Sequence, residues 1–306
     1  MRINFSAKET LIQKYISKIK ENIYNWLTKD AMPIFLRGQD NISFTPNVFG
    51  YHEVRVKELI GYCVSEGYQD FLLDIGANIG LITCQSGDLF KEVHCYEPNP
   101  DCFNILKVNT RISLSKCQLH LNEFGLGSEK SIKDLYVPKG NWGGGFIHDE
   151  HNSYHDEQLG SKDGYVGFDS TNYNLTPIVI ESAKQVLSDL FKNLRSKNMN
   201  KGFIKIDVEG YEPLIIKSIA ESLPDNFDVI ILFEYFSKPF NPDKLLGYFN
   251  KRATGYNLAR IPEKRFPKIK RIWKIFSQFG YEYRLQKFDM NSNSTDIVFI
   301  VNSNKS

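Results

Sequence analysis

A short apolar segment that ends in an acid and a glycine-containing turn constrains this chain most. Residues 71–80 read Phe-Leu-Leu-Asp-Ile-Gly-Ala-Asn-Ile-Gly, and from Ile79 onward the apolar residues recur at helical spacing. This pattern predicts a buried strand ending at Asp74, a turn in which Gly76 and Gly80 let the backbone approach a ligand, and a helix N-terminus with free N–H groups. The segment therefore indicates the first βα unit of a nucleoside-binding sheet.

A second acid follows at the offset that a bound ribose requires. Residues 93–97 read Val-His-Cys-Tyr-Glu, a second strand pattern that ends in a carboxylate. Its distance from the glycine turn is close to the roughly 20 residues expected for an acid that accepts hydrogen bonds from ribose hydroxyls. Asn78 occupies the place of the middle glycine in the dinucleotide fingerprint, so a pyrophosphate fits poorly. Asp74 would repel phosphate and attract an ammonium or sulfonium group. These features favour S-adenosylmethionine as the cofactor.

Composition places the chain among globular proteins. Its 306 residues are 42% hydrophobic, enough for a sizeable core, and the net charge of +2 gives no global reason to expect nucleic acid as a partner. No apolar run approaches the roughly 20 residues of a transmembrane segment, and no signal peptide is evident. The five cysteines include no C-x-x-C pair, which argues against a disulfide framework and a structural zinc site. We expect a cytoplasmic protein.

Strand and helix patterns alternate along most of the chain. They predict an α/β fold with a doubly wound, seven-stranded, mostly parallel sheet and helices on both faces. The predicted strands are 71–75, 92–97, 117–122, 202–207, 228–234, 281–288 and 296–301.

Two domain-level segments are expected around this sheet. Residues 1–50 would form an N-terminal helical extension and 51–306 the main domain. An amphipathic helix at 8–28 is expected to pack on its own domain, with a dimer contact or a membrane surface as alternatives. The polar stretch of about 128–180 predicts an inserted loop or small hairpin region. A basic C-terminal segment of about 252–280 includes a predicted helix at 267–278.

A further strand pattern, later in the chain, also ends in acids: residues 203–212 read Phe-Ile-Lys-Ile-Asp-Val-Glu-Gly-Tyr-Glu. In a doubly wound sheet ligands bind at the carboxyl ends of the strands, so Asp207 and Glu209 should face the same crevice as the acids after the first two strands. Glu234 would be their neighbour from the next strand. Three carboxylates at one edge repel one another unless a proton, a cation or basic side chains share the site. We therefore expect a divalent cation held by Asp207, Glu209 and Glu234, or else a carboxylate base there.

Three of the six histidines lie in the polar stretch, at His148, His151 and His155. His148 is our catalytic candidate, as a base or a metal ligand, although a polar surface loop can accumulate histidines without function. Imidazole with carboxylate oxygens suits Mn²⁺ or Fe²⁺, and oxygen ligands alone suit Mg²⁺.

Three motifs together resemble the FkbM-type methyltransferases: Asp-Ile-Gly-Ala-Asn-Ile-Gly from Asp74, Tyr-Glu-Pro-Asn-Pro at 96–100 and Lys-Ile-Asp-Val-Glu-Gly at 205–210. The resemblance covers roughly residues 52–236. It implies a class I methyltransferase sheet, S-adenosylmethionine as cofactor, and methylation of hydroxyl groups on sugars, glycans or polyketides. The residues that it places around the cofactor are Asp74, Gly76, Asn78 and Gly80 at the methionine end and ribose, Glu97 at the ribose diol, and Glu123 or Phe124 beside adenine.

The predicted function is O-methylation of a sugar hydroxyl, by Asp207, Glu209 and His148. A nucleotide-activated sugar or surface-glycan precursor is the preferred acceptor, because the insertion is polar and the tail is basic. A polyketide acceptor, a nicotinamide-dependent oxidoreductase and a non-catalytic nucleoside-binding protein are the alternatives, and a homo-oligomer is left open. Basic residues that could bind a diphosphate or an anionic membrane, or form a solvated helix face, are Arg260, Lys264, Arg265, Lys268, Lys270, Arg271 and Lys274.

Overall fold

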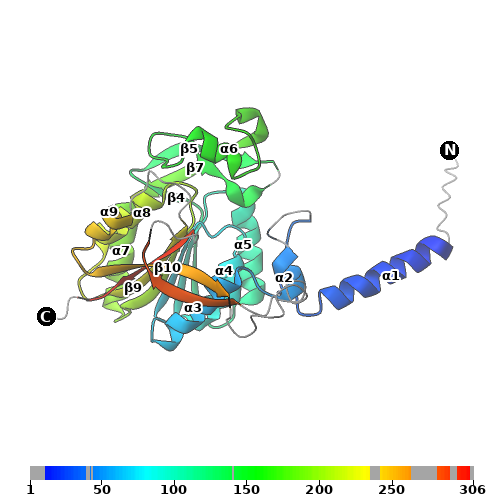
Figure 1. The fold of residues 1–306 in the computed structure, drawn as a ribbon, viewed down its shortest axis with the longest axis horizontal. Helices are drawn as coiled ribbons and strands as arrows, with labels where there is room; N and C mark the ends of the chain where they lie inside the picture. Colours follow the sequence, from blue (N-terminus) through cyan, green and yellow to red (C-terminus); the bar gives the residue numbers. More distant parts are fainter. Residues whose placement is uncertain are drawn as a thin grey trace, which may run out of the picture.

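An eight-stranded sheet forms the centre of the molecule (Figure 1). The computed structural model describes residues 11–38, 42, 44–139, 141–234, 242–262, 281–289 and 295–303. The strands of this sheet are β1 (Phe71–Ile75), β2 (Glu92–Tyr96), β3 (Gln118–Asn122), β8 (Lys201–Ile206), β9 (Asp228–Glu234), β10 (Ala253–Pro262), β11 (Tyr281–Lys287) and β12 (Asp296–Val301). Their order is β11-β10-β12-β9-β8-β1-β2-β3.

Most of the sheet is parallel, as the alternation of strands and helices predicted. β1 pairs in parallel with β2 and β8, and these pair in parallel with β3 and β9. β12 runs antiparallel to both β9 and β10, and β11 runs antiparallel to β10. The doubly wound fold class is thus confirmed, with one strand more than the seven that we expected.

The additional strand is β10, which lies within the segment predicted as a basic tail. Its sequence, Ala-Thr-Gly-Tyr-Asn-Leu-Ala-Arg-Ile-Pro, contains glycine, asparagine and a terminal proline, which are depleted in strands. Pairing with β12 on one side and β11 on the other overrides this weak local preference. The predicted helix at 267–278 and the basic residues from Lys264 to Lys274 lie outside the described residues.

Helices cover both faces of the sheet. On one face, side chains of α7 (Ala183–Ser196) and α8 (Glu212–Ser222) pack on Phe71, Leu73 and Ile75 of β1. On the other face, α3 (Val54–Ser65), α4 (Leu81–Ser86) and α5 (Pro100–Ser113) pack on Leu72. The short helix α9 (Pro242–Gly247) lies beside α8 and β10, on the face that α7 and α8 cover. Because β1 is buried on both faces, its sequence is a continuous apolar run apart from Asp74.

The predicted insertion forms a second, four-stranded sheet above the first (Figure 1). Its strands are β4 (Gly125–Gly127), β5 (Ser131–Pro138), β6 (Phe146–Ile147) and β7 (Tyr173–Ser182), with α6 (Asp156–Ser161) between β6 and β7. β5 and β7 pair antiparallel along the whole length of β5. The insertion also has a buried cluster separate from the core of the large sheet, formed by Phe146, Tyr154, Leu159 and Tyr173.

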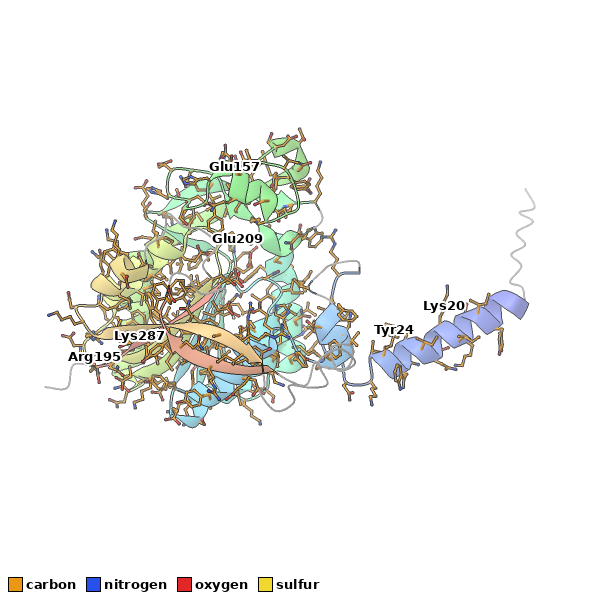
Figure 2. The ribbon with its side chains drawn as sticks, viewed as in Figure 1. Lys20, Tyr24, Glu157, Arg195, Glu209 and Lys287 are labelled. Carbon is orange, nitrogen blue, oxygen red and sulfur yellow. The ribbon has the colours of Figure 1, made fainter. Side chains whose placement is uncertain are left out.

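The N-terminal helix α1 (Leu11–Leu27) extends away from the sheet, and Figure 2 shows Lys20 and Tyr24 far from it. The apolar side chains Ile16, Ile19 and Ile23 are exposed, so the expectation that this face packs on its own domain was wrong. A short helix, α2 (Phe44–Phe49), connects this part to α3. None of the helices in the described ranges combines the length and apolar character that crossing a membrane requires.

Candidate active site

A cavity lies between the carboxyl ends of β1, β2 and β8 and the small sheet of the insertion. It contains about 740 Å³ of empty space, including its open mouth. One part of its wall is polar and is formed by Asn78, Glu97, Asn99, Asp207, Glu209 and Tyr211. The other part is mostly apolar. The strand ends and the segment after β3 contribute Ile75, Tyr96, Pro98 and Leu126, and the insertion contributes Leu135, Trp142, Phe146, Ile147, Ile178 and Ile180.

The turn after β1 forms the floor of this cavity. Gly76 has a φ of +79°, and a Cβ atom there would collide with the backbone carbonyl of Asp207, which follows the neighbouring strand β8. Asn78 also adopts the left-handed region, with a φ of +51°. Lys205 Nζ donates a hydrogen bond to the Gly76 carbonyl at 3.0 Å. Glycine is therefore required at position 76 because the turn lies directly against the backbone that follows β8, whereas we had expected it to make room for a ligand.

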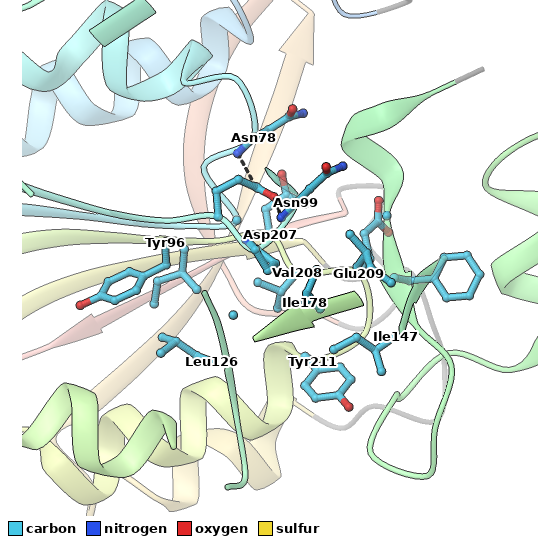
Figure 3. A pocket seen from close by; sticks show the side chains of 18 of the residues that line it. Asn78, Tyr96, Asn99, Leu126, Ile147, Ile178, Asp207, Val208, Glu209 and Tyr211 are labelled. Carbon is cyan, nitrogen blue, oxygen red and sulfur yellow. Dashed lines mark hydrogen bonds between the residues drawn. The ribbon is translucent and has the colours of Figure 1, made fainter. Parts of the chain in front are cut away.

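Glu97 joins the turns that follow β1 and β2. Its two carboxylate oxygens accept hydrogen bonds from the backbone N–H groups of Asn78, at 2.7 Å, and Asn99, at 2.8 Å (Figure 3). Burial raises the pKa of Glu97 to about 7, although the two N–H donors act in the opposite direction. Each oxygen can accept a second hydrogen bond. Glu97 is therefore held in place on the cavity wall, with capacity left for a hydroxyl group.

Asp74 lies beneath the turn and does not line the cavity. Its side chain is fully buried, and one oxygen accepts a hydrogen bond from the Thr83 hydroxyl at 2.7 Å. The other oxygen lies 3.5 Å from Lys205 Nζ. The carboxylate that we expected to attract a cationic ligand is thus already paired with a lysine. Lys205 is a residue of this site that our sequence reasoning missed.

Asp207 and Glu209 lie on the polar wall, where the turn after β8 faces the insertion (Figure 3). Asp207 Oδ2 lies 3.0 Å from Lys205 Nζ. Glu209, with a φ of +51°, lies 3.4 Å from Lys162 Nζ of the insertion. Burial raises the pKa of Glu209 to about 7, and the positive charge of Lys162 opposes this shift. Glu209 can therefore exchange a proton near neutral pH.

The insertion covers the turns of the large sheet. Asn99 Nδ2 donates to the Trp142 carbonyl at 3.4 Å, and a Cβ atom at Gly143 would collide with the side-chain amide of Asn78. Asn152 Nδ2 donates to the carbonyls of Ile147, at 2.7 Å, and Glu209, at 3.0 Å. Hydrogen bonds thus hold the insertion against the turns that follow β2 and β8. No sequence motif had indicated these contacts.

Besides Asp74 and Glu234, four predicted residues do not line the cavity. Gly80 begins α4 with a φ of +88°, and a Cβ atom there would meet Leu106 of α5. Phe124 packs on Tyr96, with ring centroids 5.7 Å apart, while Glu123 is exposed. The fourth residue is His148, whose Nε2 pairs with Asp156 at 2.9 Å and whose ring lies against Phe168.

Within the described residues, the carboxylate oxygens of Asp207, Glu209 and Glu234, which we expected to share a cation, do not all lie within 4.8 Å of one another. Their partners are basic side chains: Asp207 faces Lys205, Glu209 faces Lys162, and Glu234 lies 3.5 Å from Arg55. Within the described ranges, the only set of three metal-ligating residues whose donor atoms all lie within 4.8 Å of one another is Glu92, His94 and His120. Of the three ways in which the repulsion between these carboxylates could be relieved, a proton, a cation or basic side chains, the structure shows basic side chains.

Comparison with protein families gives one match. The model of the methyltransferase FkbM domain matches residues 74–283. Comparison with curated proteins gives no significant match.

Three solved structures that match this chain share little sequence with it. A precorrin 8w decarboxylase from Methanobacterium thermoautotrophicum is 12% identical, with a TM-score of 0.37 over 82% of this chain and 89% of that one. A SAM-dependent methyltransferase from Agrobacterium tumefaciens is 8% identical, with a TM-score of 0.38 over 81% and 61%. A precorrin-6y C5,15-methyltransferase from Geobacter metallireducens is 10% identical, with a TM-score of 0.35 over 80% and 89%.

Proposed function

This chain belongs to the FkbM methyltransferase family, and from that premise we propose that it methylates a sugar hydroxyl group, with S-adenosylmethionine as donor. The preferred acceptor is a nucleotide-activated sugar or a surface-glycan precursor. One observation carries this proposal: a single cavity is lined by Glu97 and the turn after β1, and also by Asp207 and Glu209. A cofactor subsite and a site for proton removal thus share one space.

The residues of the cavity fit S-adenosylmethionine. Glu97 would accept hydrogen bonds from the ribose hydroxyls, as the acid after the second strand does in this class of sheet. The apolar wall of Pro98, Leu126, Ile178 and Ile180 suits a flat purine base. Gly76 and Asn78 line the cavity beside Glu97, so the methionine part would lie against this turn. When bound, this cofactor supplies an electrophilic methyl group on a positively charged sulfur.

Glu209 is the proposed general base. An alcohol that attacks a methyl group must lose its proton, and a base is most effective when its pKa lies near the working pH. Burial brings the pKa of Glu209 to about 7, so a substantial fraction is ionised at neutral pH. Lys162 would hold the carboxylate in its orientation from 3.4 Å. Asp207, paired with Lys205, would help to position the acceptor hydroxyl.

The distribution of polar groups supports a sugar as the acceptor. Asn78, Asn99, Asp207 and Glu209 offer donors and acceptors around one part of the cavity, which several hydroxyl groups could satisfy. The insertion, however, turns the apolar side chains of Leu135, Trp142 and Phe146 toward the same cavity. These side chains favour a second candidate, an apolar hydroxyl compound such as a polyketide.

A substrate panel distinguishes these candidates. Nucleotide sugars, free sugars and apolar alcohols are incubated with the protein and S-adenosylmethionine, and mass spectrometry detects the gain of one methyl group. We expect methylation of the sugars and its loss in Glu209→Gln, with the exposed Glu123→Gln as matched control. Methylation confined to the apolar alcohols would replace the sugar by the second candidate, and methylation of nitrogen or carbon would contradict O-methylation.

A further inference from the structure

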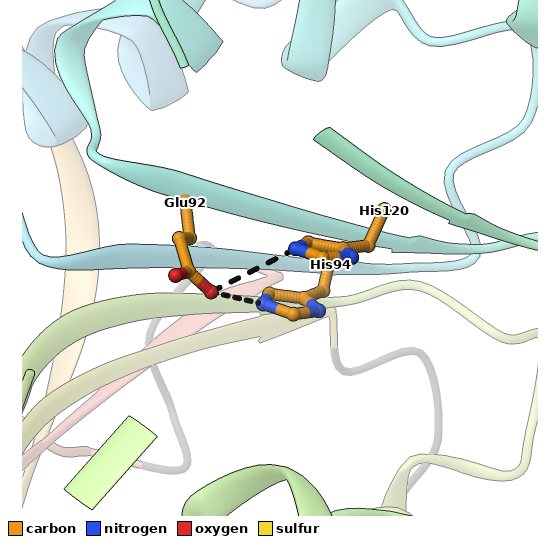
Figure 4. Close-up of side chains that lie close together, drawn as sticks. All are labelled: Glu92, His94 and His120. Atoms are coloured by element: carbon orange, nitrogen blue, oxygen red, sulfur yellow. Dashed lines mark hydrogen bonds and ion pairs between the residues drawn. The ribbon is translucent and has the colours of Figure 1, made fainter. Parts of the chain in front are cut away.

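A cluster of two histidines and one glutamate lies on the sheet, away from the carboxyl ends of the strands that form the cavity. Glu92 and His94 are two positions apart on β2, so both side chains project from the same face. His120 on the neighbouring strand β3 is the register partner of His94. Three potential metal ligands therefore come together through strand pairing alone, at the edge of the sheet that ends in β3 (Figure 4).

The donor atoms of these residues converge. Glu92 Oε2 lies 3.3 Å from His94 Nε2 and 3.8 Å from His120 Nε2, and all three atoms lie within 4.8 Å of one another. The two imidazole rings are stacked, with centroids 4.4 Å apart and planes inclined by 5°. The side chains of Glu92 and His94 are buried, with 2% and 9% exposed, whereas that of His120 is 38% exposed. One side of the cluster is therefore accessible to solvent.

The protein itself does not fully satisfy this cluster. His120 Nε2 is buried and makes no hydrogen bond within the described part of the chain. Glu92 is paired through its other oxygen, Oε1, with Lys197 Nζ at 2.6 Å. Glu92 Oε2, the oxygen that faces the two histidines, forms a hydrogen bond with His94 Nε2 at 3.3 Å. In the described part of the chain, His120 Nε2 is thus the nitrogen of the cluster left without a hydrogen bond, and a buried polar atom in that situation is costly.

We propose that Glu92, His94 and His120 bind a divalent transition metal ion of the Zn²⁺ class. Two imidazole nitrogens and one carboxylate oxygen are ligands that Zn²⁺ accepts, whereas Mg²⁺ and Ca²⁺ prefer oxygen alone. A water molecule would supply the fourth ligand, reaching the buried donor atoms when the partly exposed His120 ring turns. The absence of paired cysteines, which argued against structural zinc, does not bear on this site because its ligands include no cysteine.

The ion would connect the edge strand β3 to β2. Binding requires the stacked rings to turn toward each other, because a metal lies close to the plane of each imidazole that it binds. It also places a second positive charge close to the ammonium group of Lys197. That side chain is 35% exposed, so it can move into solvent when the ion binds. Lys197 therefore competes with the metal for Glu92 at this site.

Calorimetric titration of the metal-stripped full-length protein with ZnCl₂ tests this site. We expect one equivalent to bind to the wild type, and His120→Ala to weaken binding at least about tenfold, the lower end of the cost of losing even an outer-shell partner. His151→Ala, which removes an exposed histidine of the insertion, is the matched control. Co²⁺ substitution adds an optical readout, because thiolate ligation would give a sulfur-to-cobalt absorption band and thereby reveal binding to a cysteine instead.

Substitution of Lys197 tests the same proposal in the opposite direction. Lys197→Met removes the competing cation, so we expect it to increase Zn²⁺ affinity and to increase the rise in melting temperature that Zn²⁺ produces. A purely structural ion pair predicts a less stable variant with no change in metal binding. The proposal is overturned if the wild type binds no Zn²⁺, if His120→Ala binds it as tightly as the wild type, or if Lys197→Met does not strengthen binding.

Discussion

At the scale of single residues, two lysines determine which carboxylates of the site can change their charge. Lys205 lies 3.5 Å from Asp74 and 3.0 Å from Asp207 and is itself buried between them. Lys162 lies 3.4 Å from Glu209, but burial outweighs its charge and raises the pKa of that glutamate to about 7. Glu209 is therefore the carboxylate of the polar wall best suited to accept a proton during turnover.

The pH dependence of methyl transfer tests this assignment. Because only ionised Glu209 can accept a proton, kcat/KM should rise as the pH increases through about 7. Glu209→Gln should remove that limb of the profile and lower kcat by roughly 10²- to 10⁴-fold, the usual contribution of a general base. The exposed Glu123→Gln should leave the profile unchanged. An unaltered profile in Glu209→Gln would assign the base to another group.

At the scale of elements, the sequence predicted those helices, strands and turns that depend on residues close together in the chain. The strand at 71–75, its glycine turn and the helix after it were all readable, because local periodicity and turn residues specify them. The four-stranded sheet of the insertion was not, since its core depends on the pairing of β5 with β7, which are far apart in the chain. Its contacts with the turn after β8 were equally hidden, because they pass through Asn152 and backbone carbonyls rather than through a motif.

Asn152→Ala tests whether the insertion positions Glu209. The substitution removes the donor to the Ile147 and Glu209 carbonyls and the acceptor for the Tyr154 N–H, so we expect a loss of roughly 1–3 kcal/mol in the free energy of unfolding. It should also raise KM for the acceptor more than for S-adenosylmethionine, because Glu209 lies on the proposed acceptor side. Asn174→Ala on the exposed side of β7 is the control. Equal effects on both KM values would indicate a general loss of structure.

At the scale of the whole molecule, the sheet brings acids together, but the packing of separate elements decides which cations reach them. Arg55 comes from α3, Lys162 from the insertion and Lys205 from β8, and each faces one of the predicted acids. These basic partners offset the charges of Asp207, Glu209 and Glu234, and the cation site inferred there from strand ends stays a prediction. Of the predicted cofactor residues, Gly76, Asn78 and Glu97 line the cavity, because all three lie close to strand ends that the sequence had located.

Binding of S-adenosylhomocysteine, the demethylated product of the donor, tests the central claim most directly. Isothermal titration calorimetry of the wild type should show one site for this compound and none for NADH. Glu97→Ala should weaken binding by about 1–3 kcal/mol, because it removes the proposed ribose acceptor and the partner of the Asn78 and Asn99 N–H groups, whereas the exposed Glu150→Ala should have no effect. Binding of NADH without binding of S-adenosylhomocysteine, or equal affinity in Glu97→Ala and the wild type, would contradict the account.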